Sequence, residues 1–204
     1  MIRLLVIFGA SGDLTGRYLM PAIASLLQCG RLPAEFRVLG IARKDWDTER
    51  FRRHIGERLD RHAGALERPL REAVLKMLEY RPADVSDAKQ VAQALSGINE
   101  PAVIYLALPP SLYAPVIKAL ATIDLPRDVR LVIEKPFGED LASAQALNQL
   151  LHHTFSERQV YRIDHFLHHQ TVQNLLGLRF ATASSSRSGI CNMLSASTLS
   201  GMKP

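Results

Sequence analysis

Short apolar runs alternate with longer amphipathic stretches along most of this chain. The apolar runs predict buried strands at 2–8, 36–42, 102–108 and 129–133, and a further short strand in 80–87 that leads into a loop. Helical spacing predicts helices over 14–27, 47–59, 67–78, 88–95, 111–120, 140–151 and 171–178. Ser111 is the expected cap of one helix, and Asp140 lies near the start of another, where a carboxylate favours the helix dipole. This alternation predicts an α/β fold with a doubly wound parallel sheet.

The pattern changes near the end of the sequence. From residue 182 to residue 204 the chain is Ser-rich and nearly uncharged, and the alternation stops. A length of 204 residues suits one ordinary domain. We therefore expect one domain over 1–181 and an irregular, disordered tail over 182–204.

Composition narrows the class of protein. Apolar residues make up 47% and charged residues 22%, as in soluble proteins, and no run approaches the ~20 apolar residues that span a bilayer. The net charge is +5, but both signs mix along 52–72, which argues against a nucleic-acid partner; the lack of a long apolar run argues against a membrane. Cys29 and Cys191 lie far apart, so we expect no disulfide framework and a reducing, cytoplasmic location.

A glycine-containing turn follows the first predicted strand. In "FGASGDLT", Gly9 and Gly12 precede a helix that Asp13 opens. Glycine lets the backbone turn sharply and lets a pyrophosphate approach the main chain, and the following helix N-terminus attracts phosphate. The alternative is an ordinary strand-to-helix turn. Its place after the first buried strand favours a Rossmann-like dinucleotide site.

The end of the second predicted strand bears on the choice of coenzyme. It reads "LGIARKDW", with Arg43 and Lys44 before the first acid, Asp45. NAD binders usually carry an acid here for the ribose hydroxyls, whereas a guanidinium can bind a 2′-phosphate through two hydrogen bonds. We therefore expect NADP rather than NAD; the alternative is an ordinary surface arginine.

Two later stretches carry polar groups suited to a substrate. Lys135 in "VIEKPFGED" ends a predicted strand, where open α/β sheets bind ligands, although an ordinary surface lysine would fit the same position. Asp164 and His165 are adjacent in a hydrophobic segment, and such a pair can orient a base or hold a phosphate. His165, His168 and His169 lack carboxylate and cysteine companions at metal-binding spacing, so we expect no metal.

Together these stretches resemble the glucose-6-phosphate dehydrogenase family. The resemblance covers about residues 4–181 and rests on "FGASGDLT", "LGIAR", "YLALPPSLY", "VIEKPFGEDLASAQALN" and "YRIDHFLHHQTVQNLLGLRFA", in the family's order and spacing. It implies hydride transfer from C1 of glucose 6-phosphate to NADP, which gives 6-phosphogluconolactone, the first step of the pentose phosphate pathway. It also implies a homo-oligomer whose contacts lie in a second domain that carries substrate-binding and dimerisation surfaces.

The resemblance further implies roles for the matching residues. The pyrophosphate loop falls on Gly9, Ala10, Ser11, Gly12, Asp13 and Leu14, the 2′-phosphate arginine on Arg43, and a stretch near the adenine on Asp84 and Val85. Lys135 matches the lysine that touches both substrate and coenzyme. Asp164 matches the aspartate that orients the catalytic histidine, and His165 matches the histidine that holds the sugar phosphate.

The sequence departs from the family at the substrate end. Residues 166–170 read Phe-Leu-His-His-Gln where the family reads Tyr-Leu-Gly-Lys-Glu, and Gly16 and Tyr18 stand where it often has lysines. A neutral His169 binds a phosphate dianion less well than the lysine it replaces. The family's proton-accepting histidine lies in the second domain, so we expect this chain to bind coenzyme without turnover. The alternatives are a stand-alone NADP-binding or regulatory module and a nonfunctional fragment.

The tail has a genetic interpretation. After "LRFA" the family continues with a pattern like Asn-x-Leu-Phe-Glu-Pro-x-Trp-Asn, which residues 182–204 lack. Codons exist for residues 182–203 that, after one added A, read NRLFEPIWNMQHAERIDIVWDE, in agreement with that continuation. We therefore infer a single-nucleotide deletion near codon 182, either in the gene or from sequencing, that shifts the reading frame; the alternative is a natural flexible tail.

Overall fold

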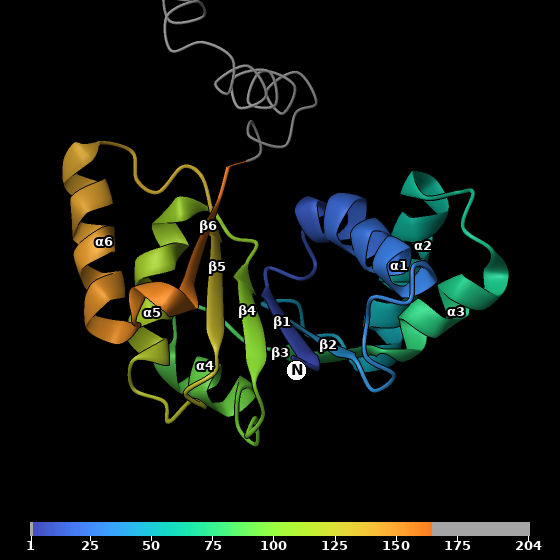
Figure 1. The fold of residues 1–204 in the computed structure, drawn as a ribbon, viewed down its shortest axis with the longest axis horizontal. Coiled ribbons are helices and arrows are strands. Elements are labelled where there is room, and N and C mark those ends of the chain that lie inside the picture. The colour runs from blue at the N-terminus through green and yellow to red at the C-terminus, as the bar shows by residue number, and fades with distance from the viewer. Residues whose placement is uncertain (1, 165–204) are drawn as a thin grey trace, which may run out of the picture. The chain divides into compact units, whose positions relative to one another are not determined.

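One parallel sheet organises the part of the chain that the computed structural model describes, residues 2–164 (Figure 1). Its strands are β1 (Leu4–Phe8), β2 (Arg37–Ala42), β3 (Leu78–Pro82), β4 (Ala102–Leu106), β5 (Arg130–Glu134) and β6 (Val160–Ile163). Their order is β3-β2-β1-β4-β5-β6, so the direction of winding reverses between β1 and β4. The predicted doubly wound, Rossmann-like α/β fold is confirmed. The tail expected over 182–204 and the helix expected over 171–178 lie outside the described residues.

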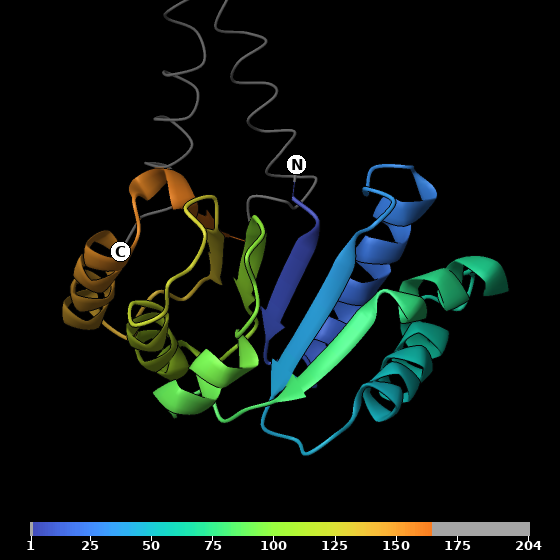
Figure 2. The same cartoon turned by 90° about the horizontal axis from the view of Figure 1, so that it is seen from below.

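Helices cover both faces of this sheet. They are the π-helical turn η1 (Thr15–Leu19), α1 (Met20–Gln28), α2 (Thr48–His62), α3 (Arg68–Lys76), α4 (Ala88–Ala94), the 3-10 turn η2 (Pro110–Leu112), α5 (Tyr113–Leu120), α6 (Leu141–Thr154) and the 3-10 turn η3 (Glu157–Gln159). Figure 2 shows α1, α2 and α3 on one face and α4, α5 and α6 on the other. No helix among residues 2–164 is long and apolar enough to cross a membrane.

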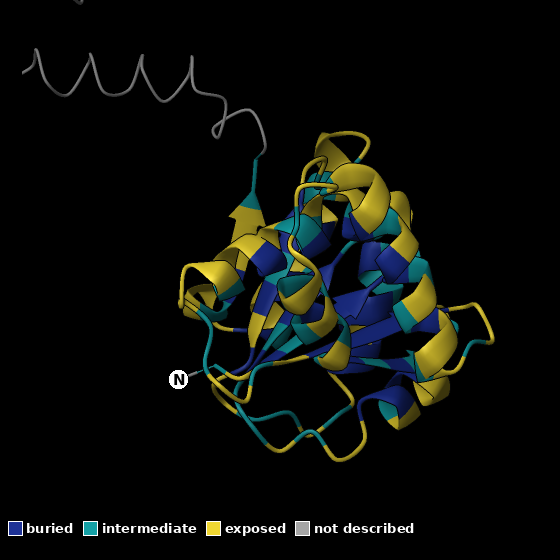
Figure 3. Ribbon diagram, turned by 90° about the vertical axis from the view of Figure 1, so that its right-hand side faces the viewer, coloured by how far each residue is buried: buried dark blue, intermediate teal, exposed yellow. Residues whose placement is uncertain are grey.

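Two apolar cores lie between the sheet and these helix layers. Along β1, Val6 and Phe8 pack into the core under α4–α6, whereas Ile7 packs into the core under α1–α3. Because both faces of the sheet are covered, most residues of the central strands are buried, whereas the outer sides of the helices, many loops and the edge strand β6 are exposed (Figure 3). This double burial explains the continuous apolar runs in the sequence.

Side-chain caps fix the starts of three α-helices. Asp47 accepts a hydrogen bond from the Arg50 amide at 2.7 Å at the start of α2, and Asp87 caps α4 in the same way. Asp140 and Ser143 form a reciprocal capping box at the start of α6, as the position of Asp140 led us to expect.

The predicted cap at Ser111 is wrong. Ser111 lies inside η2, and α5 follows this turn directly without a side-chain cap. The amides of Leu112 and Tyr113 already bond the carbonyls of Pro109 and Pro110, so the preceding turn satisfies donors that a cap would serve.

Two further elements differ from the sequence expectation. The helix predicted over 14–27 begins with a π-helical turn, in which the Met20 amide bonds the Thr15 carbonyl. Pro21 follows at once, and its ring excludes the ordinary hydrogen bond of an α-helix, which accounts for the wider turn before it. The strand β6 was not predicted, because its two central residues, Tyr161 and Arg162, are exposed at the edge of the sheet.

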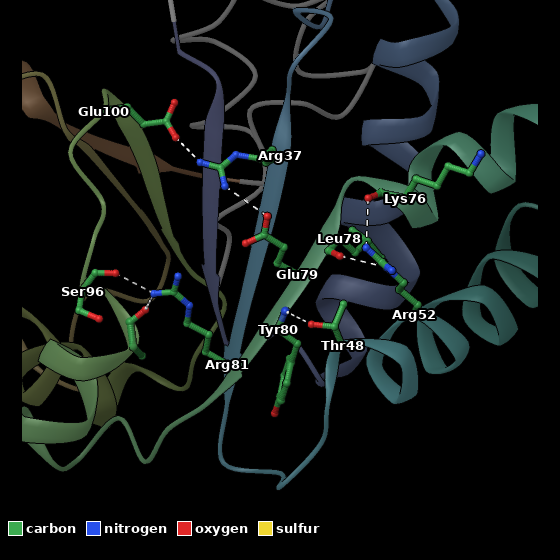
Figure 4. Close-up of polar contacts among 11 residues, drawn as sticks. Arg37, Thr48, Arg52, Lys76, Leu78, Glu79, Tyr80, Arg81, Ser96 and Glu100 are labelled. Atoms are coloured by element: carbon green, nitrogen blue, oxygen red, sulfur yellow. Dashed lines mark hydrogen bonds and ion pairs between the residues drawn. The ribbon is translucent and has the colours of Figure 1, made fainter.

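Arginine side chains tie the edge of the sheet to its surroundings (Figure 4). Arg37 on β2 pairs with Glu79 at 3.2 Å and with Glu100. On α2, Arg52 donates to the carbonyl of Leu78 at 3.1 Å, and Arg81 on β3 donates to carbonyls at the end of α4. These bonds hold β3 and α2 in place, and the loop between β2 and α2 is therefore anchored at both ends.

Candidate functional site

The turn after β1 can be made only with glycine at its first position. Gly9 has φ +80°, and a Cβ built on it would lie 2.1 Å from the carbonyl oxygen of Ala107. The amides of Gly9 and Ala10 both donate to the carbonyl of Ile41, at 2.8 and 3.2 Å. The turn is thus held tightly between the carboxyl ends of β2 and β4, at the point where the winding reverses.

The rest of the turn leads into a helix N-terminus. The Gly12 amide donates to the Gly9 carbonyl at 2.9 Å, and the chain is helical from Asp13 onwards. A Cβ on Gly12 would lie 3.0 Å from that same carbonyl oxygen, so this position also favours glycine. The six residues expected to bind pyrophosphate, 9–14, therefore form one tight turn at a helix N-terminus, the geometry that binds phosphate.

An arginine from α2, not anticipated from the sequence, completes this turn. The Arg58 Nη2 atom lies 2.5 Å from the Asp13 Oδ1 atom, and the Arg58 side chain is only 18% exposed. Its aliphatic part lies against Gly16, where a Cβ would come within 2.8 Å of the Arg58 Cγ atom. The bare Gly16 therefore makes room for Arg58, which fixes the Asp13 carboxylate.

The predicted 2′-phosphate residue lies directly after β2. Arg43 is exposed, and the next residue, Lys44, is held through its backbone. The Tyr80 hydroxyl lies 2.7 Å from the Lys44 carbonyl oxygen and 3.0 Å from that of Ala42. Burial, together with the charge of Asp45, raises the pKa of Tyr80 to about 12, so this hydroxyl remains a donor at neutral pH.

An aromatic and cationic cluster joins the loop that follows Arg43 to the first turns of α2. The Lys44 ammonium is 4.4 Å and the Arg50 guanidinium 5.6 Å from the centre of the Trp46 ring. The His54 ring lies 5.0 Å from that ring. Burial lowers the pKa of His54, and the charges of Lys44 and Arg58 lower it further, against the opposing influence of Glu57 and the Ser11 carbonyl. The loop and α2 together concentrate positive charge around Trp46, and this charge favours the neutral form of His54.

The stretch expected near the adenine lies after β3. Asp84 is partly buried and its carboxylate accepts the Ser86 amide at 2.9 Å, which stabilises its own turn. The side chain of Val85 is 3% exposed and belongs to the core under α4–α6. The Ala83 amide donates to the Ala42 carbonyl at 3.0 Å, which joins this segment to the end of β2.

Lys135 is exposed at the carboxyl end of β5, as predicted. Its amide donates to the Ile163 carbonyl at 3.1 Å, and Asp164 is the next residue along the chain. The peptide bond between Lys135 and Pro136 is cis. The strand ends therefore bring the backbone of Lys135 beside the end of β6; His165 and His169 lie outside the described residues.

A buried carboxylate precedes Lys135 and was missed from the sequence. Glu134 is 9% exposed and accepts a hydrogen bond from the Tyr105 hydroxyl, while the Tyr113 hydroxyl donates to the Glu134 carbonyl at 3.1 Å. Burial raises the pKa of both tyrosines, and the nearby carboxylate raises it further. Both tyrosines therefore stay protonated and hold the strand end that carries Lys135.

Comparison with known proteins agrees with this geometry. The family model described as "Glucose-6-phosphate dehydrogenase, NAD binding domain" matches residues 6–174. Among curated proteins, the glucose-6-phosphate 1-dehydrogenase of Aggregatibacter actinomycetemcomitans is 39% identical over 87% of this chain, and that of Treponema pallidum is 40% identical over 88%. The chain spans only 38% of the length of each of these relatives.

Solved structures give the same result. Glucose-6-phosphate 1-dehydrogenase from Mycobacterium avium superposes with a TM-score of 0.79 at 34% identity, over 88% of this chain and 40% of that one. A glucose-6-phosphate dehydrogenase in complex with its substrate glucose-6-phosphate gives a TM-score of 0.75 at 31% identity, over 87% of this chain and 39% of that one. This chain therefore belongs to the glucose-6-phosphate dehydrogenase family and carries the nicotinamide-coenzyme-binding domain of that family.

Proposed function

We propose that this chain binds NADP, with the pyrophosphate on the turn at 9–14 and the 2′-phosphate on Arg43. One observation carries the proposal. The turn at Gly9 is bonded to Ile41 on β2, and Arg43 follows two positions later along the same strand end. A ligand that reaches from a helix N-terminus to this strand end meets a guanidinium and no carboxylate before Asp45.

The residues present fit a dinucleotide phosphate. A Cβ at Gly9 or Gly12 would fill the space against neighbouring carbonyls, so only the bare backbone leaves the helix N-terminus open to a pyrophosphate. Lys44 and Arg50 add positive charge at the Trp46 ring, and Arg43 directly precedes Lys44; this charge suits the 2′-phosphate. When bound, the nicotinamide supplies the acceptor for a hydride.

At the substrate end we propose that Lys135 binds the sugar and the coenzyme, and that Asp164 orients a histidine. His165 and His169 are proposed phosphate contacts. The position of Lys135 supports its role, because its exposed side chain lies at the carboxyl edge where open parallel sheets bind ligands. Glucose 6-phosphate as substrate is supported by the family and by the solved relative that binds it.

The reaction of the whole-length relatives is a separate proposal for this chain, which spans 38–40% of their length. The resemblance places the proton-accepting histidine in a further domain, so we expect residues 1–204 by themselves to bind NADP without oxidising glucose 6-phosphate. A cytoplasmic location and self-association through that domain remain proposals of the same kind. A stand-alone coenzyme-binding module is the second candidate, and the fully hydrogen-bonded turn at Gly9 favours it over a fragment without function.

The test is a pair of titrations with NADP and NAD on the full chain. We expect NADP to bind about tenfold or more tightly, which corresponds to about 1.4 kcal/mol or more. Arg43→Gln should remove this preference by weakening the binding of NADP but not that of NAD. Arg61→Gln, an exposed arginine on α2, is the matched control and should leave both affinities unchanged. Equal binding of the two coenzymes by the parent chain would refute the role of Arg43, and steady NADP reduction with glucose 6-phosphate would refute the expected lack of turnover.

A further inference from the structure

A second cavity lies at the amino ends of the strands, at the opposite edge of the sheet from the Gly9 turn. It has a volume of about 680 Å³. Its polar lining comes from two segments, the entry to β5 and the turn before β6. These residues are Arg127, Asp128, Arg130, Ser156, Arg158 and Gln159. Three arginines thus converge on one cavity that the coenzyme site does not use.

The three arginines differ from most others in the described residues. Arg3, Arg37, Arg58 and Arg71, for example, each pair with a carboxylate within 4.0 Å. By contrast, Arg127, Arg130 and Arg158 form no ion pair with any residue in the range 2–164. Arg130 is instead directed over the Tyr161 ring, 5.9 Å from its centre. Their positive charge therefore remains available to a ligand, with Asp128 as the single acid in the lining.

Gln159 holds the two walls of the cavity together. Its Nε2 atom donates to the Arg127 carbonyl at 3.1 Å and to the Val129 carbonyl at 3.0 Å. Its Oε1 atom accepts the Ser156 amide at 3.0 Å and the Ser156 hydroxyl at 2.8 Å. The half-buried Gln159 side chain therefore fixes the backbone that carries Arg127 against the backbone that carries Arg158. These hydrogen bonds fix the backbone positions from which the exposed side chains of Arg127 and Arg158 extend.

We propose that this cavity, named here the arginine cavity, binds the dianionic phosphoryl group of a small phosphate ester. Three guanidiniums and one carboxylate leave two net positive charges, which match a phosphate dianion. Guanidiniums bind such oxygens through paired, charge-assisted hydrogen bonds. The volume exceeds that of one phosphate and falls in the range of small-molecule sites, so it admits the organic part of an ester.

The test separates this cavity from the coenzyme turn by mapping binding along the chain. The ¹⁵N-labelled full chain is titrated with inorganic phosphate, glucose 6-phosphate and AMP in three arms, while amide shifts are followed. We expect saturable shifts at Arg130, Ser156 and Gln159 with a Kd of roughly 1 mM or tighter for at least one ester. Tighter binding of the sugar phosphate or of the nucleotide identifies which source of phosphate the cavity prefers.

Variants then test which side chains bind. The double variant Arg127→Gln with Arg158→Gln should weaken phosphate binding in the cavity by about tenfold or more, while Arg61→Gln on α2 leaves it unchanged. Both changes are on exposed side chains, and unchanged amide spectra elsewhere verify the fold. Shifts confined to Ser11, Gly12 and Asp13, equal affinity in the double variant, or binding of RNA without binding of any small ester would each overturn the proposal.

Discussion

Arg58 on α2 and Asp13 in the turn after β1 form an ion pair with 2.5 Å between Nη2 and Oδ1, across 45 residues of sequence. The Asp13 side chain is 62% exposed, so its negative charge lies on the solvent side of the turn. A carboxylate at a helix N-terminus competes with a bound phosphate for the same positive end of the helix dipole. Arg58 neutralises that carboxylate, and the turn can therefore accept an anion.

Arg58→Ala should consequently weaken NADP binding more than it weakens the fold. The half-exposed ion pair and the arginine stem packed on Gly16 together contribute about 1 kcal/mol to the free energy of unfolding. We expect NADP affinity to fall about tenfold, because the Asp13 charge beside the pyrophosphate then keeps only its longer, exposed ion pair with Arg17, at 4.0 Å. Adding Asp13→Asn to Arg58→Ala should restore most of the affinity, as measured by titration. A loss that persists in this double variant would contradict the charge argument.

Gly9→Ala tests the close approach of the turn to β4. Gly9 has φ +80°, and a Cβ on it would lie 2.1 Å from the Ala107 carbonyl oxygen. We therefore expect Gly9→Ala to lower the free energy of unfolding by about 3 kcal/mol or more and to abolish coenzyme binding. Gly30→Ala is the matched control, because Gly30 also has a positive φ of +64° but open space around it. Gly30→Ala should lower the free energy of unfolding by only about 1–2 kcal/mol and leave NADP binding intact. Similar losses in denaturant unfolding of the two variants would show that the contact with Ala107 has no role.

Tyr80→Phe tests whether the loop that carries Arg43 is held in place from β3. The substitution keeps the ring against Trp46 and Phe51 but removes the hydroxyl that bonds Lys44 and Ala42. We expect a loss of about 1 kcal/mol in stability, since both carbonyls keep backbone partners. NADP affinity should fall while NAD affinity changes little, because only NADP uses Arg43. Tyr161→Phe, at an exposed tyrosine, is the control, and an equal loss for both coenzymes would contradict the positioning role of Tyr80.

The inferred frameshift makes a prediction at the level of DNA. We expect the genomic codons for residues 182–203, read after one added base, to encode NRLFEPIWN followed by further family-like sequence. A natural flexible tail would have codons that give an unrelated peptide in that frame. Sequencing across codon 182 from genomic DNA distinguishes the two.

The sequence pattern predicted the parts of this fold in which local residues settle the outcome. β1, β2, β4 and β5 are buried on both faces, so their apolar runs are unambiguous. The turn at Gly9 was predicted because its conformation depends on the glycine itself. The edge strand β6 was missed because pairing on one side only lets polar residues such as Tyr161 stand in a strand.

The site residues that were missed depend on contacts between distant segments. Glu134 is buried and accepts a hydrogen bond from Tyr105, 29 residues earlier, and no local pattern in the sequence indicates that donor. Arg58 reads as one of many charges on a solvated helix, and its role follows only from the packing of α2 on the turn. His54 likewise lies on a charged helix. Its contact with the Trp46 ring and its proximity to Lys44 depend on how the loop after β2 folds back on α2, which the local sequence does not indicate.

His54 should make the stability of the domain sensitive to mild acid. Burial and the positive charges of Lys44 and Arg58 lower its pKa below the usual 6.5 in the folded chain. Well above pH 6.5 the His54 imidazole is neutral in both the folded and the unfolded chain, so it does not make the free energy of unfolding depend on pH. As the pH falls below 6.5, the unfolded chain takes up the proton first, and the free energy of unfolding decreases until the pH passes the folded pKa.

His54→Gln should remove this dependence, because glutamine keeps a polar side chain of similar size that does not titrate. Denaturant unfolding at about pH 7.5 and about pH 5.5 measures it, in a range above the titration of most carboxylates. Arg53→Gln, at the adjacent exposed position on α2, controls for the loss of a polar group without a titration in this range. We expect the parent and Arg53→Gln to lose stability by the same amount between the two pH values and His54→Gln to lose less. An equal loss in all three proteins would mean that the acid sensitivity arises elsewhere.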